Sequence, residues 1–147
     1  AVAILLLSQA AYAKEIDVLL PVTGSLTPYE KSELTREAVD VLSARFELKH
    51  GEEVDLVVKQ AFLEESKKND CDETNCYRRI AAQYHAEKIV ALRVAQVAKG
   101  SYLMTAHLYD VPTDAMTFSE KRKCEDCSIQ KFKALTKELM SRMAKVN

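Results

Sequence analysis

The sequence predicts an α+β fold in which helices flank a mixed sheet of about five strands. Apolar residues alternate with other residues from position 88 to 123, the period-2 pattern of strands. Other stretches place apolar residues three or four apart behind capping residues, as amphipathic helices do. Only three Gly and three Pro occur in 147 residues, which leaves no room for a long linker. We expect a single domain with the order strand, helix, strand, short helix, helix, three strands, helix.

The three consecutive strands are the clearest prediction. Gly100 supplies the turn conformation that residues with a Cβ resist, so the runs on either side of it should form a hairpin. Residues 112–114 (Pro-Thr-Asp) punctuate the chain before a third run at 115–121. The inward set of the hairpin is predicted to consist of Val90, Leu92, Val94, Tyr102, Met104, Ala106 and Leu108.

The front half predicts a strand, a helix and a second strand. Residues 16–22 (IDVLLPV) indicate a short buried strand. Thr27, Pro28 and Glu30 have the form of a capping box with proline at the first helical position. The helix is expected over 28–48, ended by His50-Gly51. A second strand is expected at 54–58 (VDLVV).

The remaining helices follow from capping signals and apolar spacing. A short helix is expected at 60–68, a polar loop at 67–73, and a third helix capped by Thr74. Ser128 is expected to cap the last helix. The buried stripe of the third helix should be Cys76, Tyr77, Ile80, Ala81 and Tyr84, and that of the last helix Ile129, Phe132, Leu135, Leu139 and Met143.

Charge gives no reason to expect a nucleic-acid partner, because the formal net charge is −1. Its distribution is uneven: residues 14–58 carry 5 Lys/Arg against 10 Asp/Glu, and residues 128–147 carry 5 against 1. An acidic front could dock on the basic last helix, or both could be ordinary solvated faces. Lys121, Arg122 and Lys123 suggest either peripheral contact with anionic lipid or the charged protection of an edge strand.

The first thirteen residues resemble the remnant of a secretory signal peptide. An apolar run leads to Ala11-Tyr12-Ala13, a small-residue cleavage site, and the run is too short to span a bilayer. We therefore expect residues 1–13 to be an export signal and 14–147 to form one α+β envelope domain. The alternative is an apolar first strand or helix.

The four cysteines of an exported domain predict disulfide bonds at Cys71, Cys76, Cys124 and Cys127. Four cysteines allow three connectivities, and local pairing of Cys71 with Cys76 and of Cys124 with Cys127 is the favoured one. Crossed pairs remain open, and so does a zinc site built from the four sulfurs. His50, His85 and His107 are scattered without ligand spacing, so we predict no metal site and no cofactor.

The stretch from Cys71 to Cys127 resembles a known group of envelope domains. It runs from CDETNCYRRI through the hairpin and the LYDVPT turn to KRKCEDC. This layout is similar to the TolB amino-terminal-like group, which includes domains related to the curli secretion subunit CsgG and the penicillin-binding-protein activator LpoB. The TGSLTPYE connection departs from that pattern. The resemblance implies a periplasmic, non-catalytic module that binds other envelope proteins.

No constellation of catalytic residues accompanies these features: there is no G-x-S-x-G elbow and no Gly-rich phosphate loop. We therefore predict a protein that is not an enzyme, acting as a subunit or accessory factor of a secretion, outer-membrane or motility assembly. Its partners would be other envelope proteins, with self-association as a further option and no transmembrane span. The alternatives are a periplasmic thiol-disulfide oxidoreductase using Cys124 and Cys127, and a small-ligand or metal binder.

Overall fold

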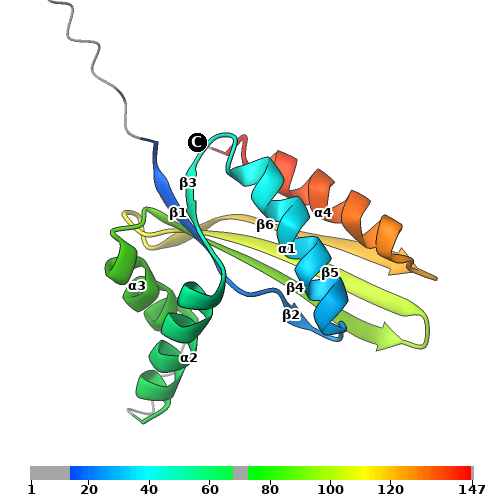
Figure 1. Cartoon of the computed structure of the whole chain (residues 1–147), viewed down its shortest axis with the longest axis horizontal. Coiled ribbons are helices and arrows are strands. Elements are labelled where there is room, and N and C mark those ends of the chain that lie inside the picture. Colours follow the sequence, from blue (N-terminus) through cyan, green and yellow to red (C-terminus); the bar gives the residue numbers. More distant parts are fainter. Residues whose placement is uncertain (1–13, 68–72, 147) are drawn as a thin grey trace, which may run out of the picture.

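The computed structural model describes residues 14–67 and 73–146, and over these residues the fold is α+β, as predicted (Figure 1). Four helices and six strands make up one domain. In chain order the elements are β1 (Ile16–Leu19), β2 (Thr23–Gly24), α1 (Pro28–Leu42), β3 (Glu47–Lys49), α2 (Glu52–Lys67), α3 (Glu73–Tyr84), β4 (Lys88–Ala98), β5 (Ser101–Asp110), β6 (Ala115–Glu125) and α4 (Ile129–Met143).

The sheet is mixed, with the strand order β3-β1-β4-β5-β6 and with β2 also pairing with β4. β1 runs parallel to both of its neighbours, whereas β4, β5 and β6 form the predicted antiparallel meander. Gly100 lies in the β4–β5 turn with a φ of 72°, the left-handed conformation for which a glycine was expected there. β6 is an edge strand, so the charged run at 121–123 stands where charge discourages pairing with another sheet.

The first strand is shorter than the predicted 16–22, and a second short strand, β2, follows beyond the predicted one. β1 ends at Leu19, and Pro21, which has no N–H to donate, separates it from β2. Gly24 in β2 approaches β4 so closely that a Cβ there would lie 1.9 Å from the carbonyl oxygen of Val94. A glycine is therefore required at this position of β2.

The predicted start of α1 is confirmed and its predicted end is wrong. The backbone N–H of Glu30 donates to the Thr27 hydroxyl at 3.1 Å, and the Thr27 N–H donates to the Glu30 carboxylate at 2.9 Å. The helix ends at Leu42 and not near residue 48. Glu47–Lys49 instead extends the sheet as β3, because pairing beside β1 satisfies its backbone groups.

The predicted strand at 54–58 is also wrong, because these residues lie within helix α2. Val54 and Ala61, seven residues apart, are buried on one face of the helix, and Val57, Val58 and Phe62 pack beside them. Residues seven apart lie on the same face of a helix. Packing of this apolar face outweighs the small intrinsic helix penalty of β-branched valine. α2 thus absorbs both the predicted strand and the predicted short helix at 60–68.

The other two helices are close to the predictions, except that α3 begins at Glu73, so Thr74 lies within the helix and is not its cap. In α3, Cys76, Tyr77, Ile80 and Ala81 are buried and Tyr84 is half-buried. In α4, the N–H of Lys131 donates to the Ser128 hydroxyl at 3.3 Å, which is the expected cap. Phe132, Leu139 and Met143 are buried on its inner face, while Ile129 and Leu135 are half-buried.

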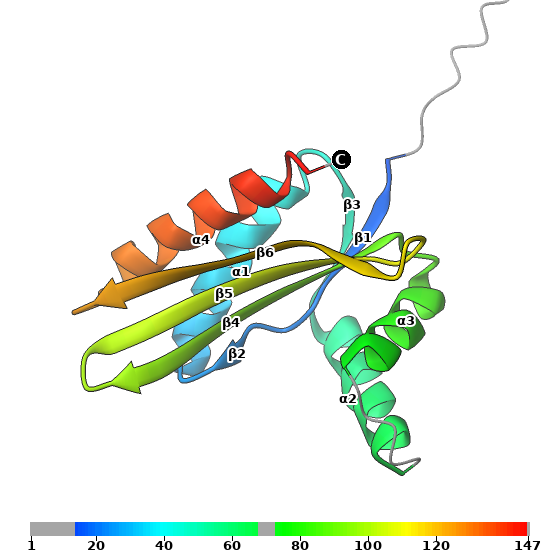
Figure 2. The same ribbon diagram turned by 180° about the vertical axis from the view of Figure 1, so that it is seen from behind.

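Each face of the sheet has its own pair of helices (Figures 1 and 2). α1 and α4 lie side by side on one face, over a core that includes Leu92, Met104 and Leu108. Lys133 of α4 contacts Glu33 at 3.4 Å and Glu37 at 3.7 Å on α1, so part of the acidic front does meet the basic last helix. α2 and α3 cover the opposite face over a second, smaller core around Ile80, Ile89 and Tyr109.

Candidate interaction groove

The face of the sheet that carries α2 and α3 is only partly covered. These helices pack at the end where β1, the start of β4 and the end of β5 meet, and the meander extends beyond them (Figure 2). A groove of about 560 Å³ lies where the cover ends. It is lined by Pro21, Thr23, Phe62, Tyr77, Ala91, Leu92, Arg93, Ala95, Leu103, Thr105, His107, Ser119 and Lys121.

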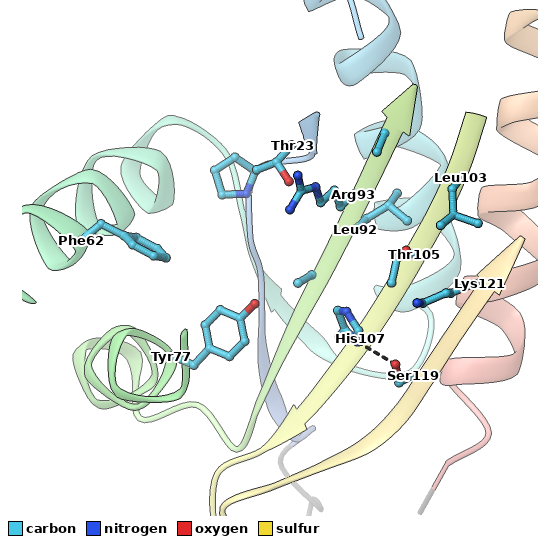
Figure 3. A pocket seen from close by; sticks show the side chains of 13 residues that line it. Thr23, Phe62, Tyr77, Leu92, Arg93, Leu103, Thr105, His107, Ser119 and Lys121 are labelled. Carbon is cyan, nitrogen blue, oxygen red and sulfur yellow. Dashed lines mark hydrogen bonds between the residues drawn. The ribbon is translucent and has the colours of Figure 1, made fainter. Parts of the chain in front are cut away.

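Strand register arranges the floor of the groove in rows. Arg93 of β4 pairs with Thr105 of β5, which pairs with Lys121 of β6. In the next row, Ala91 pairs with His107 and His107 with Ser119. These residues alternate along their strands with core residues such as Leu92, Val94 and Met104, so all of them lie on the open face. Figure 3 shows Lys121 pointing from β6 toward β5.

The walls of the groove are apolar and come from the helices. Phe62 of α2 and Tyr77 of α3 project toward the sheet, as Figure 3 shows, and Leu103 lies on the sheet itself. Tyr77 is held against Tyr109 of β5 with ring centroids 5.8 Å apart. Because Tyr77 is only 2% exposed, the apolar surface that an occupant would meet comes mainly from Phe62 and Leu103. Polar side chains lie beside them, the mixture found in binding sites.

The charge of the groove has one sign. Arg93 and Lys121 are the formal cations among the thirteen lining residues, and none of those residues is acidic. Both cations are exposed. The polar groups beside them are the Thr105 and Ser119 hydroxyls and the His107 ring. The groove is thus suited to an anionic ligand group.

The arrangement lacks the parts of a nucleophilic site. The Ser119 hydroxyl and His107 Nδ1 lie 2.9 Å apart, which is hydrogen-bonding distance. Catalysis by such a pair would need a third group that orients the imidazole, and no such group contacts His107 in the described ranges 14–67 and 73–146. The pair can bind a polar group, and the geometry gives no reason to assign it a reaction.

The predicted cysteine sites are placed as follows. Cys124, at the end of β6, and Cys127, before α4, are joined by a disulfide with Cα atoms 5.4 Å apart. Because these two sulfurs are bonded to each other, they do not form the predicted alternative of a four-sulfur zinc site. Cys76 is buried in α3. Cys71 lies outside the described residues, so its pairing with Cys76 stays a prediction.

A second polar cluster lies at the start of β1, on the face of the sheet that α1 and α4 cover. Asp17 is only 1% exposed, and its Oδ1 has no hydrogen-bond partner. Burial raises the pKa of Asp17 from 3.8 to about 8, helped by a hydrogen bond with Glu15 and opposed by the charge of Lys88. The Lys88 ammonium contacts Glu15 at 3.4 Å. A hydrogen bond with Glu15 also raises the pKa of the neighbouring Glu87 carboxyl.

Two further features are absent from residues 14–67 and 73–146. No three His, Cys, Asp or Glu side chains there are grouped so that they could hold a metal ion. None of the helices in that part of the chain combines the length and the apolar character needed to cross a bilayer.

The sequence alone did not identify most of the groove residues as site residues. The signal for their orientation was present, because Arg93, Thr105 and Lys121 occupy the positions that alternate with the core set. What strand alternation does not reveal is where the covering helices stop. The wrong prediction of a strand at 54–58 also hid the groove, since these residues belong to α2, the helix that forms one of its walls.

Comparison with known proteins identifies the fold. No protein-family model matches the sequence, and neither does any curated protein. Among solved structures, the LpoB C-terminal domain from Escherichia coli is similar with a TM-score of 0.52 and 15% identity, over 80% of this chain and 87% of that one. A lipoprotein from Neisseria meningitidis gives 0.52 and 11%, over 88% and 96%. TolB from Acinetobacter baumannii gives 0.54 and 12%, over 90% of this chain and 28% of that protein.

Proposed function

The chain has the small α+β fold of the LpoB C-terminal domain and of part of TolB, and from this fold we propose a non-catalytic, periplasmic interaction module. It would serve as a subunit or accessory factor of a bacterial cell-envelope assembly, such as a secretion, outer-membrane or motility machine. The groove between α2–α3 and the open face of the meander would be its contact surface. The observation that carries the proposal is this groove: an amphipathic, open sheet face with no catalytic arrangement in it.

Three observations support an envelope location. Residues 1–13 lie outside the described residues, but their sequence has the form of an export signal, which would leave 14–147 as the mature domain. The Cys124–Cys127 disulfide suits an oxidising compartment. One protein with this fold, from Neisseria meningitidis, is a lipoprotein by name.

The alternative function as a thiol-disulfide oxidoreductase is favoured less by the geometry. Reactive thiols of such enzymes are accessible and lie at a helix N-terminus. Cys124 is 5% exposed, belongs to the core beneath α4, and lies at the end of a strand. Reduction of insulin by the purified protein would support the alternative if Cys127→Ser abolished it. We expect no reduction by either form.

Site-specific photocrosslinking in cells that export the protein tests the proposal. A photoreactive residue replaces Leu103, which is half-buried in the groove, and in a second variant replaces Lys137, exposed on α4 at the other side of the sheet. We expect Leu103 to give a discrete adduct with another envelope protein and Lys137 to give none. Equal labelling from both positions, or no adduct from Leu103, would contradict the assignment of the groove as the contact surface.

A further inference from the structure

The two cations of the groove differ from Arg122, a cation on the covered face of β6. On the covered face of β6, Arg122 contacts Glu120 at 3.0 Å and Glu138 at 3.2 Å, and Glu120 also contacts Arg142 of α4 at 2.7 Å. On the open face, neither Arg93 nor Lys121 has a carboxylate within ion-pair distance among the side chains that the structure describes, those of residues 14–64 and 74–146. Arg122 is therefore neutralised on the covered face of β6, whereas Arg93 and Lys121 remain available on the open face.

The spacing of these cations matches a particular kind of ligand. Neighbouring strands lie about 4.8 Å apart, so the Arg93 and Lys121 backbones are about 10 Å apart with Thr105 between them. In an extended peptide, side chains two residues apart lie on one face and about 7 Å from each other. Long Arg and Lys side chains can lean inward to reach two carboxylates at that spacing.

We propose that the groove binds an acidic, extended segment of a partner protein. Two carboxylates two residues apart would pair with Arg93 and Lys121, and the apolar side chain between them, on the opposite face of the segment, would pack against Phe62 of α2. The inference rests on the proposed function and deepens it, because it names the chemistry by which the partner is recognised. Complementary charge at such a surface steers association and selects the partner.

Binding of defined peptides to the ¹⁵N-labelled mature domain, followed by NMR, tests the proposal. The probe is acetyl-Ser-Glu-Leu-Glu-Ser-amide, and the matched probe carries Gln in place of both Glu. We expect saturable shifts of the amides at 91–95, 103–107 and 119–121 with the acidic probe. Exposed ion pairs contribute about 0.2–1 kcal/mol each, so the Gln probe should bind about twofold to thirtyfold more weakly. Raising salt from 50 to 500 mM should also weaken the acidic probe.

Matched variants separate the groove from general charge effects. Arg93→Glu with Lys121→Glu should abolish binding of the acidic probe and allow binding of a probe with Lys in place of both Glu. Lys137→Glu with Lys145→Glu, the same change of charge at exposed positions on or after α4, should leave the acidic probe unaffected. All four replaced residues are exposed, so the variants are expected to fold, which circular dichroism checks.

Several results would overturn the proposal. Absence of shifts with the acidic probe, equal binding of the Gln probe, or insensitivity to the Arg93 and Lys121 reversals would each do so. So would shifts of the same amides with phosphatidylglycerol vesicles or inorganic phosphate but not with the peptide, because the groove would then bind a different anion. A Leu103 photoadduct obtained alongside a failed peptide test would retain the interaction surface and reject only its acidic ligand.

Discussion

At the scale of single residues, the buried carboxyl group of Asp17 is the feature with the largest consequence for stability. Asp17 lies between Leu48 of β3 and Lys88 of β4 in the sheet register, and its neighbours in charge are Glu15, Glu87 and Lys88. Glu15 and Glu87 make a negative charge on Asp17 less favourable, while Lys88 makes it more favourable. Burial without full hydrogen bonding adds to the cost of ionising it.

We predict that Asp17 makes a contribution to stability that is lost as pH rises from about 4 to about 8. The pKa of Asp17 rises from 3.8 to about 8 on folding, so the folded chain holds this proton more tightly than the unfolded chain across that window. Asp17→Asn removes the charge and should raise the free energy of unfolding at pH 8 by about 1–3 kcal/mol. Urea unfolding at pH 5 and pH 8 measures both effects.

Asp40→Asn on the exposed side of α1 is the control for this measurement, since it removes the same charge from a solvated position. It should change the free energy of unfolding by less than about 0.5 kcal/mol. If Asp17→Asn were no more stable than the parent chain at pH 8, or if it lost as much stability as the parent between pH 5 and pH 8, the account of the buried carboxyl would be wrong.

Residue-level features were predictable from sequence where they depended on neighbours along the chain. Alternation in β4 and β5 identified Leu92, Met104 and Leu108 as core residues, and the capping box at Thr27 was correct in detail. The Asp17 cluster was not predictable in this way. Its members come together only because β1 and β4 pair in parallel across some seventy residues of chain.

At the scale of elements, the link between β6 and α4 is the best-defined local device. The Cys124–Cys127 bond closes the turn between them, Asp126 in that turn has a φ of 48°, and its N–H donates to the Gly100 carbonyl at 2.8 Å. The turn therefore ties the start of α4 to the β4–β5 hairpin. The bond closes a loop of about four residues, which by the chain-entropy relation corresponds to about 2 kcal/mol.

We predict that Cys124→Ser with Cys127→Ser lowers the free energy of unfolding by about 2 kcal/mol and leaves the fold intact. Urea unfolding followed by circular dichroism measures the loss. Adding a reductant to the parent chain should cause at least the same loss. Any loss that the reductant causes in the double variant would come from the predicted Cys71–Cys76 bond. An unchanged midpoint in the double variant would show that the bond contributes nothing to stability.

Element types were predictable where one signal dominated and failed where two signals competed. Ser128 and the spacing behind it gave α4 correctly, and Gly100 gave the hairpin. At 54–58 the β-branched residues favoured a strand. Val54, Val57, Val58 and Ala61 also fit a helical face, and packing of that face against α3, in the core that both helices share with the sheet, decided for the helix. β3 was missed because a three-residue edge strand carries almost no periodic signal.

At the scale of the whole molecule, helices cover more of one face of the sheet than of the other, and the uncovered part of the second face forms the groove. α1 and α4 cover the length of the meander on one face, whereas α2 and α3 cover only one end of the other (Figures 1 and 2). The sequence predicted helices over at least one face and part of the other. The sequence did not indicate which helices would cover which face, because this depends on the side of the sheet on which each connecting helix packs.

This asymmetry should appear as a difference in local stability between two helices of nearly equal length. α2 has 16 residues and α4 has 15, but α2 exposes Leu56 at 67% and Leu63 at 64%, whereas Phe132, Leu139 and Met143 of α4 are buried. Segments with fewer buried apolar contacts open at lower free energy. We predict that backbone amides in the middle of α2 exchange with deuterium at least about tenfold faster than those in the middle of α4.

Hydrogen exchange of backbone amides, measured by NMR, tests the predicted difference between α2 and α4. Measuring it at two pH values shows whether the exchange rates report the free energy of local opening. Phe62→Ala, which removes a wall of the groove, should speed exchange further in α2 and leave α4 unchanged, because the two helices pack in separate cores. Equal protection of α2 and α4, or an effect of Phe62→Ala that spreads into α4, would mean that the two cores open as one unit. The groove wall would then be as rigid as the sheet, and a partner would have to fit it without adjustment of α2.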